Sequence, residues 1–239
     1  MTKTFKALSA LLSYPTSELQ QAAGEIADVI EAEKLLSDDA RAALAPLIGE
    51  MATWDIYDLQ ERFVLLFDRS RTLSLNLFEH VHGESRERGP AMVDLLETYR
   101  AGGYDLAATE LPDHLPILLE FMSTLPEAEA IELLKDAGHI IAALAERLQR
   151  RETPYAAVMA GLAELAGIDR SDELVAELLK VADDDPEDLA ALDEVWEEAE
   201  VTFGPDPNAG CPVSRDMLAN MDTPINPQPG TQPGAARPV

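Results

Sequence analysis

The sequence predicts an all-α protein, a single-domain bundle of about ten helices followed by a flexible Pro/Gly-rich tail. Apolar residues recur at the 3.6-residue spacing of amphipathic helices through most of the chain, in segments rich in Ala, Leu and Glu. The alternating pattern of a half-buried strand is nearly absent. After Phe203 the composition changes abruptly, because half of the sixteen prolines lie beyond that residue.

Local start and stop signals place the helices in order along the chain. Pro15 follows the first helix, Asp38 or Asp39 can cap the third, and Pro126 precedes the longest one. In the last helix Asp185 can serve as the cap, with Pro186 at the first helical position. The expected helices cover residues 2–13, 16–33, 38–52, 55–67, 84–101, 112–124, 127–150, 153–167, 171–182 and 186–203.

Chain length and tail composition predict one domain, residues 1–203, and one flexible segment, residues 204–239. A chain of 239 residues can bury a core without disulfides. Residues 204–239 carry too few apolar groups to offset the entropy of ordering. The single cysteine, Cys211, allows no internal disulfide, and no segment has the length and apolarity of a membrane span. We therefore expect a cytoplasmic protein with no direct membrane insertion.

The formal net charge of −27 bears on the class of partner. Phosphate binding needs a basic face, so nucleic acid is excluded as a partner, and the same field repels anionic lipid. A basic or amphipathic polypeptide fits the charge well. The alternative from charge alone is a solvated surface that keeps the protein soluble.

Two short stretches concentrate the reactive side chains. Residues 77–89 contain His80 and His82, and residues 110–116 contain His114, so three of only four histidines lie there, each beside carboxylates. A packing scaffold does not need that chemistry in two separate places. We therefore expect the two stretches to form the functional site, as a catalyst, a metal site or a recognition surface.

Catalytic and metal sites are poorly supported by the spacing of these residues. His80 and His82 are two apart and would point to opposite sides of a helix, whereas a zincin needs histidines four apart. Ser85 near His82 lacks the glycines of a nucleophile elbow. We expect no catalytic residue, no metal and no cofactor, with a metalloprotein using His80, His82 and His114 as the distant alternative.

A recognition surface explains the second stretch better. Pro112 and Asp113 alone suit the first turn of a helix, where free amides accept a carboxylate, but Glu110 and His114 stay unexplained. Carboxylates and imidazoles at the rim of an apolar groove can bind an amphipathic helix carrying Arg or Lys. We expect a single groove of this kind, with the floor formed around Phe67, Phe78 and Leu115.

The sequence resembles the NarJ family, the molybdenum cofactor assembly chaperones of respiratory nitrate reductase. The similarity covers most of the domain, and its most specific block is His-Val-His-Gly-Glu-Ser-Arg at residues 80–86. Glu110, Asp113 and His114 match the Glu-x-x-Asp-His motif of the wider TorD-type maturation chaperones. One departure is Phe63, where the family often has Tyr, so a hydroxyl role at that position is in doubt. Other matching segments are residues 11–15, 66–69, 88–89, 91–96, 147–152 and 195–198.

The resemblance implies a non-enzymatic chaperone that is not part of the final membrane enzyme. It would bind the amino-terminal segment of the apo catalytic (alpha) subunit of nitrate reductase and promote molybdenum cofactor insertion before membrane assembly. A chaperone for a different molybdoenzyme is the alternative. Imidazoles at the rim would make affinity for a basic client depend on pH. The expected peptide-binding residues are Phe67, Asp68, Phe78, Glu79, His80, His82, Arg86, Glu110, Asp113 and His114.

Overall fold

The computed structural model describes residues 2–83, 85–106, 110–169 and 171–183. The chain divides into two compact units, Met1–Asp188 and Leu189–Val239, and every described residue belongs to the first. The expected helix at 186–203, the expected tail at 204–239 and Cys211 lie outside the described residues.

The described part is helical, as the sequence predicts. Backbone pairing of the strand type is limited there to one isolated antiparallel bridge between Asn76 and His114. A π-helical turn, Val64–Asp68, and a 3-10 turn, Arg71–Leu73, join α4 to the next segment. The ten α-helices of this part are α1 (Lys3–Leu11), α2 (Ser17–Glu33), α3 (Asp38–Thr53), α4 (Ile56–Phe63), α5 (Leu77–His82), α6 (Arg88–Ala101), α7 (Leu115–Thr124), α8 (Glu127–Arg150), α9 (Ala156–Ala166) and α10 (Glu173–Leu178).

Four details of the elements differ from the expected ones. The helix expected at 55–67 ends at Phe63 and continues as the π turn, and the short helix α5 was not predicted. The cap of α3 is Ser37, whose hydroxyl accepts from Ala40 N at 3.2 Å, so Asp38 is the first helical residue. The helix expected to start at residue 112 starts at Leu115, with Pro116 in its first turn.

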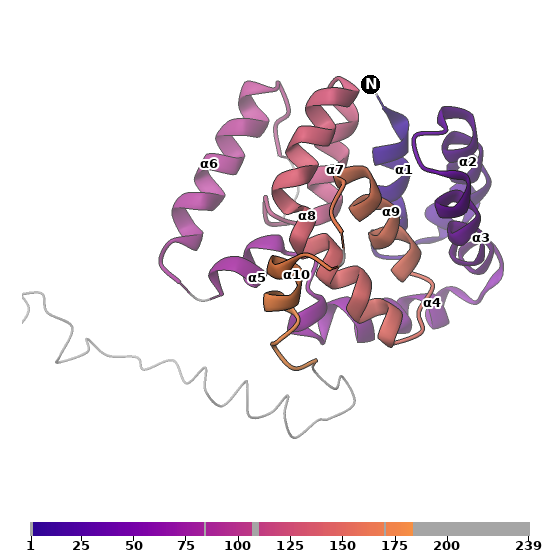
Figure 1. Cartoon of the computed structure of the whole chain (residues 1–239). Coiled ribbons are helices and arrows are strands. Elements are labelled where there is room, and N and C mark those ends of the chain that lie inside the picture. Colours follow the sequence, from indigo (N-terminus) through magenta and orange to yellow (C-terminus); the bar gives the residue numbers. More distant parts are fainter. Residues whose placement is uncertain (1, 84, 107–109, 170, 184–239) are drawn as a thin grey trace, which may run out of the picture. The chain divides into compact units, whose positions relative to one another are not determined.

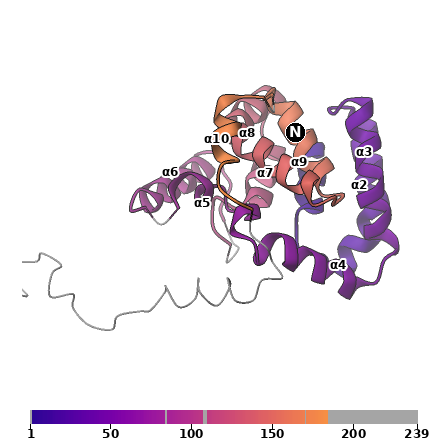
Figure 2. The same ribbon diagram turned by 60° about the horizontal axis from the view of Figure 1, so that its bottom comes forward.

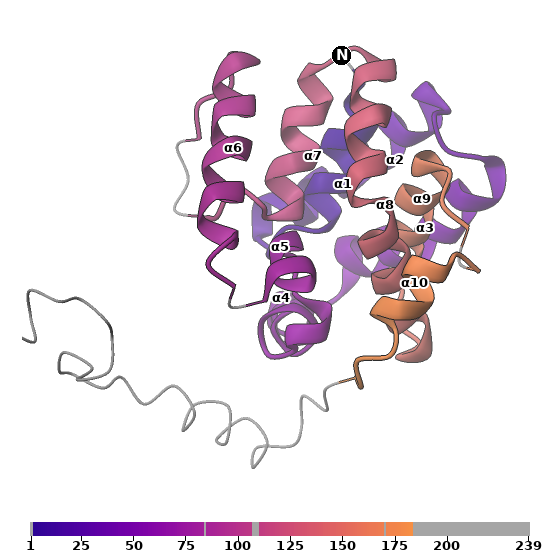
Figure 3. The ribbon, with the colours of Figure 1, turned by 60° about the vertical axis from the view of Figure 1, so that its left-hand side comes forward.

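The helices form a layered arrangement around α7 and α8. Helices α2 and α3 pack against each other on one side, and α6 lies on the opposite side, with α7, α8 and α9 between them (Figures 1, 2 and 3). Helix α1 packs against α7 and α2, and α9 packs along α8. The amino-terminal helix is therefore central rather than peripheral.

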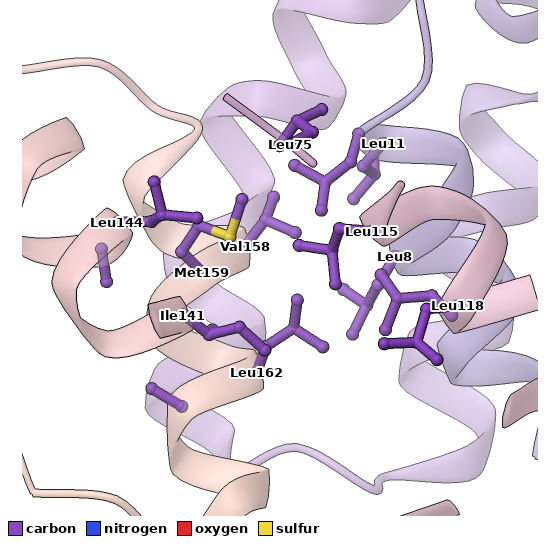
Figure 4. Packing of buried hydrophobic residues seen from close by; sticks show 14 of the residues in the cluster. Leu8, Leu11, Leu75, Leu115, Leu118, Ile141, Leu144, Val158, Met159 and Leu162 are labelled. Atoms are coloured by element: carbon purple, nitrogen blue, oxygen red, sulfur yellow. The ribbon is translucent and has the colours of Figure 1, made fainter. Parts of the chain in front are cut away.

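The core lies where α1, α7, α8 and α9 meet. Leucines of α1 and α7 point toward aliphatic side chains of α8 and α9, and Leu75 joins them from the loop before α5 (Figure 4). All of these side chains are buried. The labelled set comprises Leu8, Leu11, Leu75, Leu115, Leu118, Ile141, Leu144, Val158, Met159 and Leu162. Leu115 therefore belongs to the core and not to the floor of a groove.

Two helix starts are capped by carboxylates from distant parts of the sequence. Helix α1 has no side-chain cap of its own. Instead, Glu33 at the end of α2 accepts from Lys3 N at 2.9 Å and from Thr4 N at 2.7 Å. The first free amides of a helix need such acceptors, and an acid there also suits the helix dipole. Helix α5 is capped in the same way, by Asp113.

Candidate functional site

The two reactive stretches are joined through their backbones. Leu77 N donates to Asp113 O at 3.1 Å, and Leu115 N donates to Leu75 O at 2.8 Å. The bridge between Asn76 and His114 lies between these two bonds. The two stretches therefore lie side by side, as one functional site would require. Their side chains, however, line two different cavities.

The first cavity, which we call the acidic cavity, has a volume of about 400 Å³. It is bounded by the end of α1, the π turn, the segment before α7 and the first turns of α7. Three carboxylates and one imidazole are its ionisable groups. Its lining residues are Ser9, Ser13, Tyr14, Phe63, Asp68, Glu110, His114, Pro116, Ile117 and Glu120.

The π turn sets one wall of the acidic cavity. Arg69 N donates to Val64 O at 3.0 Å, a bond across five residues. Phe63 and Asp68, also five apart, both line the cavity. In a regular α-helix of 3.6 residues per turn, residues five apart would face different sides. Phe63 itself is buried and packs on Tyr14 and Phe67, so its packing role is confirmed.

The carboxylates of the acidic cavity differ in how they are held. Glu120 is already engaged, because it pairs with Lys6 at 3.5 Å and accepts from the Tyr104 hydroxyl at 3.1 Å. Among the described residues, no Lys or Arg forms an ion pair with Asp68 or Glu110. Burial raises the pKa of Asp68; the nearby His114 opposes this change and Glu110 adds to it. Of the three carboxylates, only Glu120 is therefore offset by a cation within the described part of the chain.

His114 contributes a neutral imidazole to the acidic cavity. Its Nδ1 donates to Oδ1 of Asn76 at 3.3 Å. Burial lowers its pKa, an effect that Glu110, Asp113 and Asp68 oppose. The ring is therefore neutral at neutral pH, and protonation would add a positive charge beside Asp68 and Glu110.

The second cavity, which we call the apolar cavity, has a volume of about 240 Å³. It lies among α5, α6, α7 and α8, and its walls are almost entirely hydrocarbon. Two carboxylates and one imidazole are the exceptions. Its lining residues are Leu77, Phe78, Val81, His82, Leu95, Asp113, Leu118, Leu133, Asp136, Ala137 and Ile140.

Asp113 is the buried charge of the apolar cavity. Its side chain is 0% exposed, and its Oδ2 accepts from Phe78 N at 2.9 Å, in the first turn of α5. Burial raises its pKa, although the bond from Phe78 N and the charge of Arg88 oppose this. The expectation that Asp113 serves the start of its own helix is wrong, because it caps α5, which begins 36 residues earlier in the chain. The reason is the bridge, which turns residues 110–114 toward α5.

The remaining expected site residues lie outside both cavities. Phe67 is buried in the core between Phe63 and Tyr155. His80 is half-buried, and its Nε2 donates to Ser74 O at 2.8 Å. Burial lowers the pKa of this imidazole. Glu79 accepts from Nη2 of Arg88 at 3.4 Å. Arg86 is exposed, and Glu84 lies outside the described residues.

Sequence reasoning missed two contributors to the acidic cavity. Tyr14, at the end of α1, is 47% exposed and brings a hydroxyl and a ring to its wall. Glu120 adds the third carboxylate. Tyr14 lies in the segment 11–15 that already resembles the chaperone family, and Glu120 follows Ile117 by three residues on one helix face. Neither residue is near a histidine in the sequence, so neither belongs to the two reactive stretches.

Metal and membrane chemistry find no support in the described residues. Nowhere in this part of the chain do three His, Cys, Asp or Glu side chains gather as a metal site would require. None of its helices combines the length and apolarity needed to cross a membrane. His80 instead bonds Ser74 O, and His114 bonds Oδ1 of Asn76.

Comparison with known proteins identifies the family. The family described as "Nitrate reductase delta subunit" matches residues 16–161, more than half of the chain and most of both cavities. The chain belongs to this family. A relative from Escherichia coli K12, named "Nitrate reductase molybdenum cofactor assembly chaperone NarJ", is 46% identical over 204 residues, covering 85% of this chain and 86% of the relative. The resemblance inferred from residues 80–86 and 110–114 is therefore confirmed.

More distant members and structures extend the comparison. A Bacillus subtilis protein named "Probable nitrate reductase molybdenum cofactor assembly chaperone NarJ" is 30% identical over 156 residues, covering 65% of this chain and 84% of that protein. The crystal structure of a putative redox enzyme maturation protein from Archaeoglobus fulgidus aligns with a TM-score of 0.52 at 22% identity, covering 70% of this chain and 94% of that one. At that identity the match supports the helical fold alone.

Proposed function

We propose that this protein is a system-specific assembly chaperone of respiratory nitrate reductase. It binds the amino-terminal segment of the apo catalytic subunit in the cytoplasm and promotes molybdenum cofactor insertion before membrane assembly. It then leaves, and it performs no catalysis. The names of the relatives in the nitrate reductase delta subunit family support this role.

The observation that carries the proposal is the acidic cavity, in which Asp68 and Glu110 form no ion pair with a Lys or Arg of the described residues. Asp68 and Glu110 line this cavity together with the apolar side chains of Phe63, Pro116 and Ile117. An amphipathic client helix can place apolar side chains on that wall and donate from Lys or Arg to the carboxylates. The net charge of −27 draws such a basic segment toward the protein.

Removing the two carboxylate charges should weaken client binding. We expect the double variant Asp68→Asn, Glu110→Gln to bind a synthetic peptide of the client's first fifteen or so residues about threefold to tenfold more weakly, the range for two partly exposed ion pairs. Titration calorimetry measures the affinity, and the helical signal in circular dichroism checks the fold.

Asp28→Asn is the matched control, because Asp28 is exposed on α2 and lines neither cavity. It changes the net charge without touching the site. If the double variant and the control bind the peptide equally well, the acidic cavity is not the binding site. If the wild-type protein binds no peptide, the proposed client is wrong, and titration with amino-terminal peptides of other molybdoenzymes is the next comparison.

Client affinity should also depend on pH, below the usual range of histidine. Burial lowers the pKa of His114 below its ordinary 6.5. Most of the imidazole is therefore neutral between pH 8 and pH 6.5. Protonation at lower pH adds a positive charge beside Asp68 and Glu110, and a basic client then binds more weakly. We expect constant affinity from pH 7 to 8 and a fall below pH 6.5 that is smaller in His114→Gln. Calorimetry across pH 5 to 8 measures both, and an identical profile in the variant would rule out His114 as the titrating group.

A further inference from the structure

One buried guanidinium joins the last described residues of the chain to the segment that follows the π turn. Arg147, on α8, is 3% exposed. Its Nη1 donates to Thr72 O at 2.8 Å, and its Nη2 donates to Leu178 O and Val181 O at 2.8 and 3.1 Å. Its Nε lies 3.0 Å from Oδ1 of Asp183. Arg147 therefore holds the 3-10 turn and the end of α10 at the same time.

The segment that contains α10, residues 172–183, is attached to α8 at both of its ends, and we call it the strap. At its start, Oδ1 of Asp172 lies 3.6 Å from Nδ1 of His139. At its end, Oδ2 of Asp183 lies 3.7 Å from Nη1 of Arg150. Between these ends α10 packs against α8 (Figures 1 and 3). The strap therefore depends on α8 for its position.

The strap has little stability of its own. Helix α10 has six residues, and isolated helices of that length are unstable in water. Among those six residues only Val175 is buried. Elements with so few buried apolar contacts open locally at a small cost in free energy. The strap is therefore well suited to leave α8 and to dock on it again.

The opposite end of the Arg147 side chain holds the segment that carries Asp68. The π turn ends at Asp68, and Thr72 follows it by four residues. Ser70 and Thr72 are both buried, and their hydroxyl oxygens lie 3.1 Å apart. Nη2 of Arg151 donates to Oγ of Ser70 at 3.4 Å. These short links tie the position of Asp68, a carboxylate of the acidic cavity, to the position of Thr72 O.

Undocking of the strap changes what Arg147 can hold. A buried cation is stable only while nearby acceptors compensate for its lost hydration. The strap supplies two carbonyl oxygens and one carboxylate to this guanidinium. When they leave, the guanidinium is drawn toward water, and its bond to Thr72 O weakens. Docking of the strap and the position of the 3-10 turn are therefore physically linked.

We propose that Arg147 is a positioning residue for client binding, through which the docked strap holds Asp68 at the wall of the acidic cavity. This proposal rests on the proposed function. By linkage, a docked strap strengthens client binding, and a bound client strengthens strap docking by the same factor. None of the described residues from 172 to 183 lines the acidic or the apolar cavity, so the effect passes through Arg147.

Asp183→Asn tests the strap end of this linkage. It removes the ion pair with Arg147 and leaves the two carbonyl bonds. We expect it to bind the client's amino-terminal peptide about threefold more weakly in titration calorimetry, the effect of one partly exposed ion pair. The loss should not exceed that of Asp68→Asn, because the strap acts through that carboxylate. Glu177→Gln is the matched control, since it removes the same charge from a strap side chain that is 69% exposed and pairs with Lys180 of the strap.

A double-mutant cycle tests whether the strap acts through Asp68. In Asp68→Asn no charge remains to be positioned, so adding Asp183→Asn should weaken peptide binding no further. A strap that only stabilises the fold predicts the same effect of Asp183→Asn in both backgrounds. Equal losses in the two backgrounds would therefore overturn the proposal.

Hydrogen exchange tests the reverse direction and needs no variant. Saturating peptide should slow the exchange of strap amides by up to about threefold, the same factor as the change in affinity. Suitable probes are Ala176 N, which bonds Asp172 O, and Leu179 N, which bonds Val175 O. Amides of α2, which lines neither cavity, should change little. Unchanged exchange in the strap, or equal slowing in α2, contradicts the linkage, and this measurement decides the question if Asp183→Asn fails to fold.

The outcomes separate this proposal from the proposed function. If the peptide responds to Asp68→Asn, Glu110→Gln, but Asp183→Asn binds it as well as Glu177→Gln does, the strap has no part in client binding and the chaperone function stands. If wild type binds no peptide, the proposed function fails and the linkage falls with it.

Discussion

Replacing Asp113 by alanine is expected to lower the free energy of unfolding by about 1–3 kcal/mol, the cost of a buried hydrogen-bonding group left without its partner. The carboxylate is fully buried and caps the first turn of α5 through Phe78 N at 2.9 Å. Without it that amide has no acceptor, and only backbone hydrogen bonds such as Leu77 N to Asp113 O still join α5 to the segment before α7. Urea unfolding followed by circular dichroism measures the change.

Asparagine at the same position separates the hydrogen bond from the charge. Burial raises the pKa of Asp113 above its ordinary 3.8, so the folded protein favours the protonated acid. The stability that this group contributes is present below pH 3.8 and is lost as pH rises through the raised value. Asp113→Asn should therefore gain stability relative to wild type on going from pH 3 to pH 7, while Asp113→Ala stays less stable than Asp113→Asn. Equal destabilisation by both variants would show that the cap contributes nothing.

The cap also shows why the fold was easier to predict than the site. Helices such as α2 and α8 carry strong apolar periodicity and local punctuation, and their positions are confirmed. Helix α5 has six residues, too few for a periodic signal, and its cap comes from Asp113 rather than from its own flank. The start of α1 depends in the same way on Glu33. Capping across 29 to 35 residues leaves no local trace in a sequence.

The sequence indicated which two stretches form the candidate site, but not that their side chains line two separate cavities. Clustering of histidines beside carboxylates pointed to residues 77–89 and 110–116, which the backbone joins. The direction of each side chain depends on the bridge between Asn76 and His114, which sends the consecutive Asp113 and His114 into different cavities. No periodicity rule for helices predicts that alternation, because the segment is extended there. The π turn at residues 64–68 was not predicted either, because the apolar pattern there continues that of the preceding helix.

Replacing Arg147 should have a large effect on stability. This residue of α8 is 3% exposed, and its guanidinium reaches two separate parts of the chain. It donates to Thr72 O at 2.8 Å, and to Leu178 O and Val181 O at 2.8 and 3.1 Å. It also pairs with Asp183 at 3.0 Å. One planar cation thus ties the 3-10 turn and the end of α10 to the middle of the bundle.

We expect Arg147→Ala to lower the free energy of unfolding by about 3 kcal/mol, the lower end of the range for breaking a buried, hydrogen-bonded ion pair. Arg150→Ala is the matched control, because Arg150 also approaches Asp183, at 3.7 Å, but is 49% exposed. A surface pair of that kind contributes at most about 1 kcal/mol. Arg147→Lys should be intermediate, since an ammonium keeps the charge but cannot reach three carbonyls in the fixed fork of a guanidinium. Urea unfolding ranks the three variants, and a Lys variant as stable as wild type would mean that the charge alone, not the geometry of the fork, holds α10 in place.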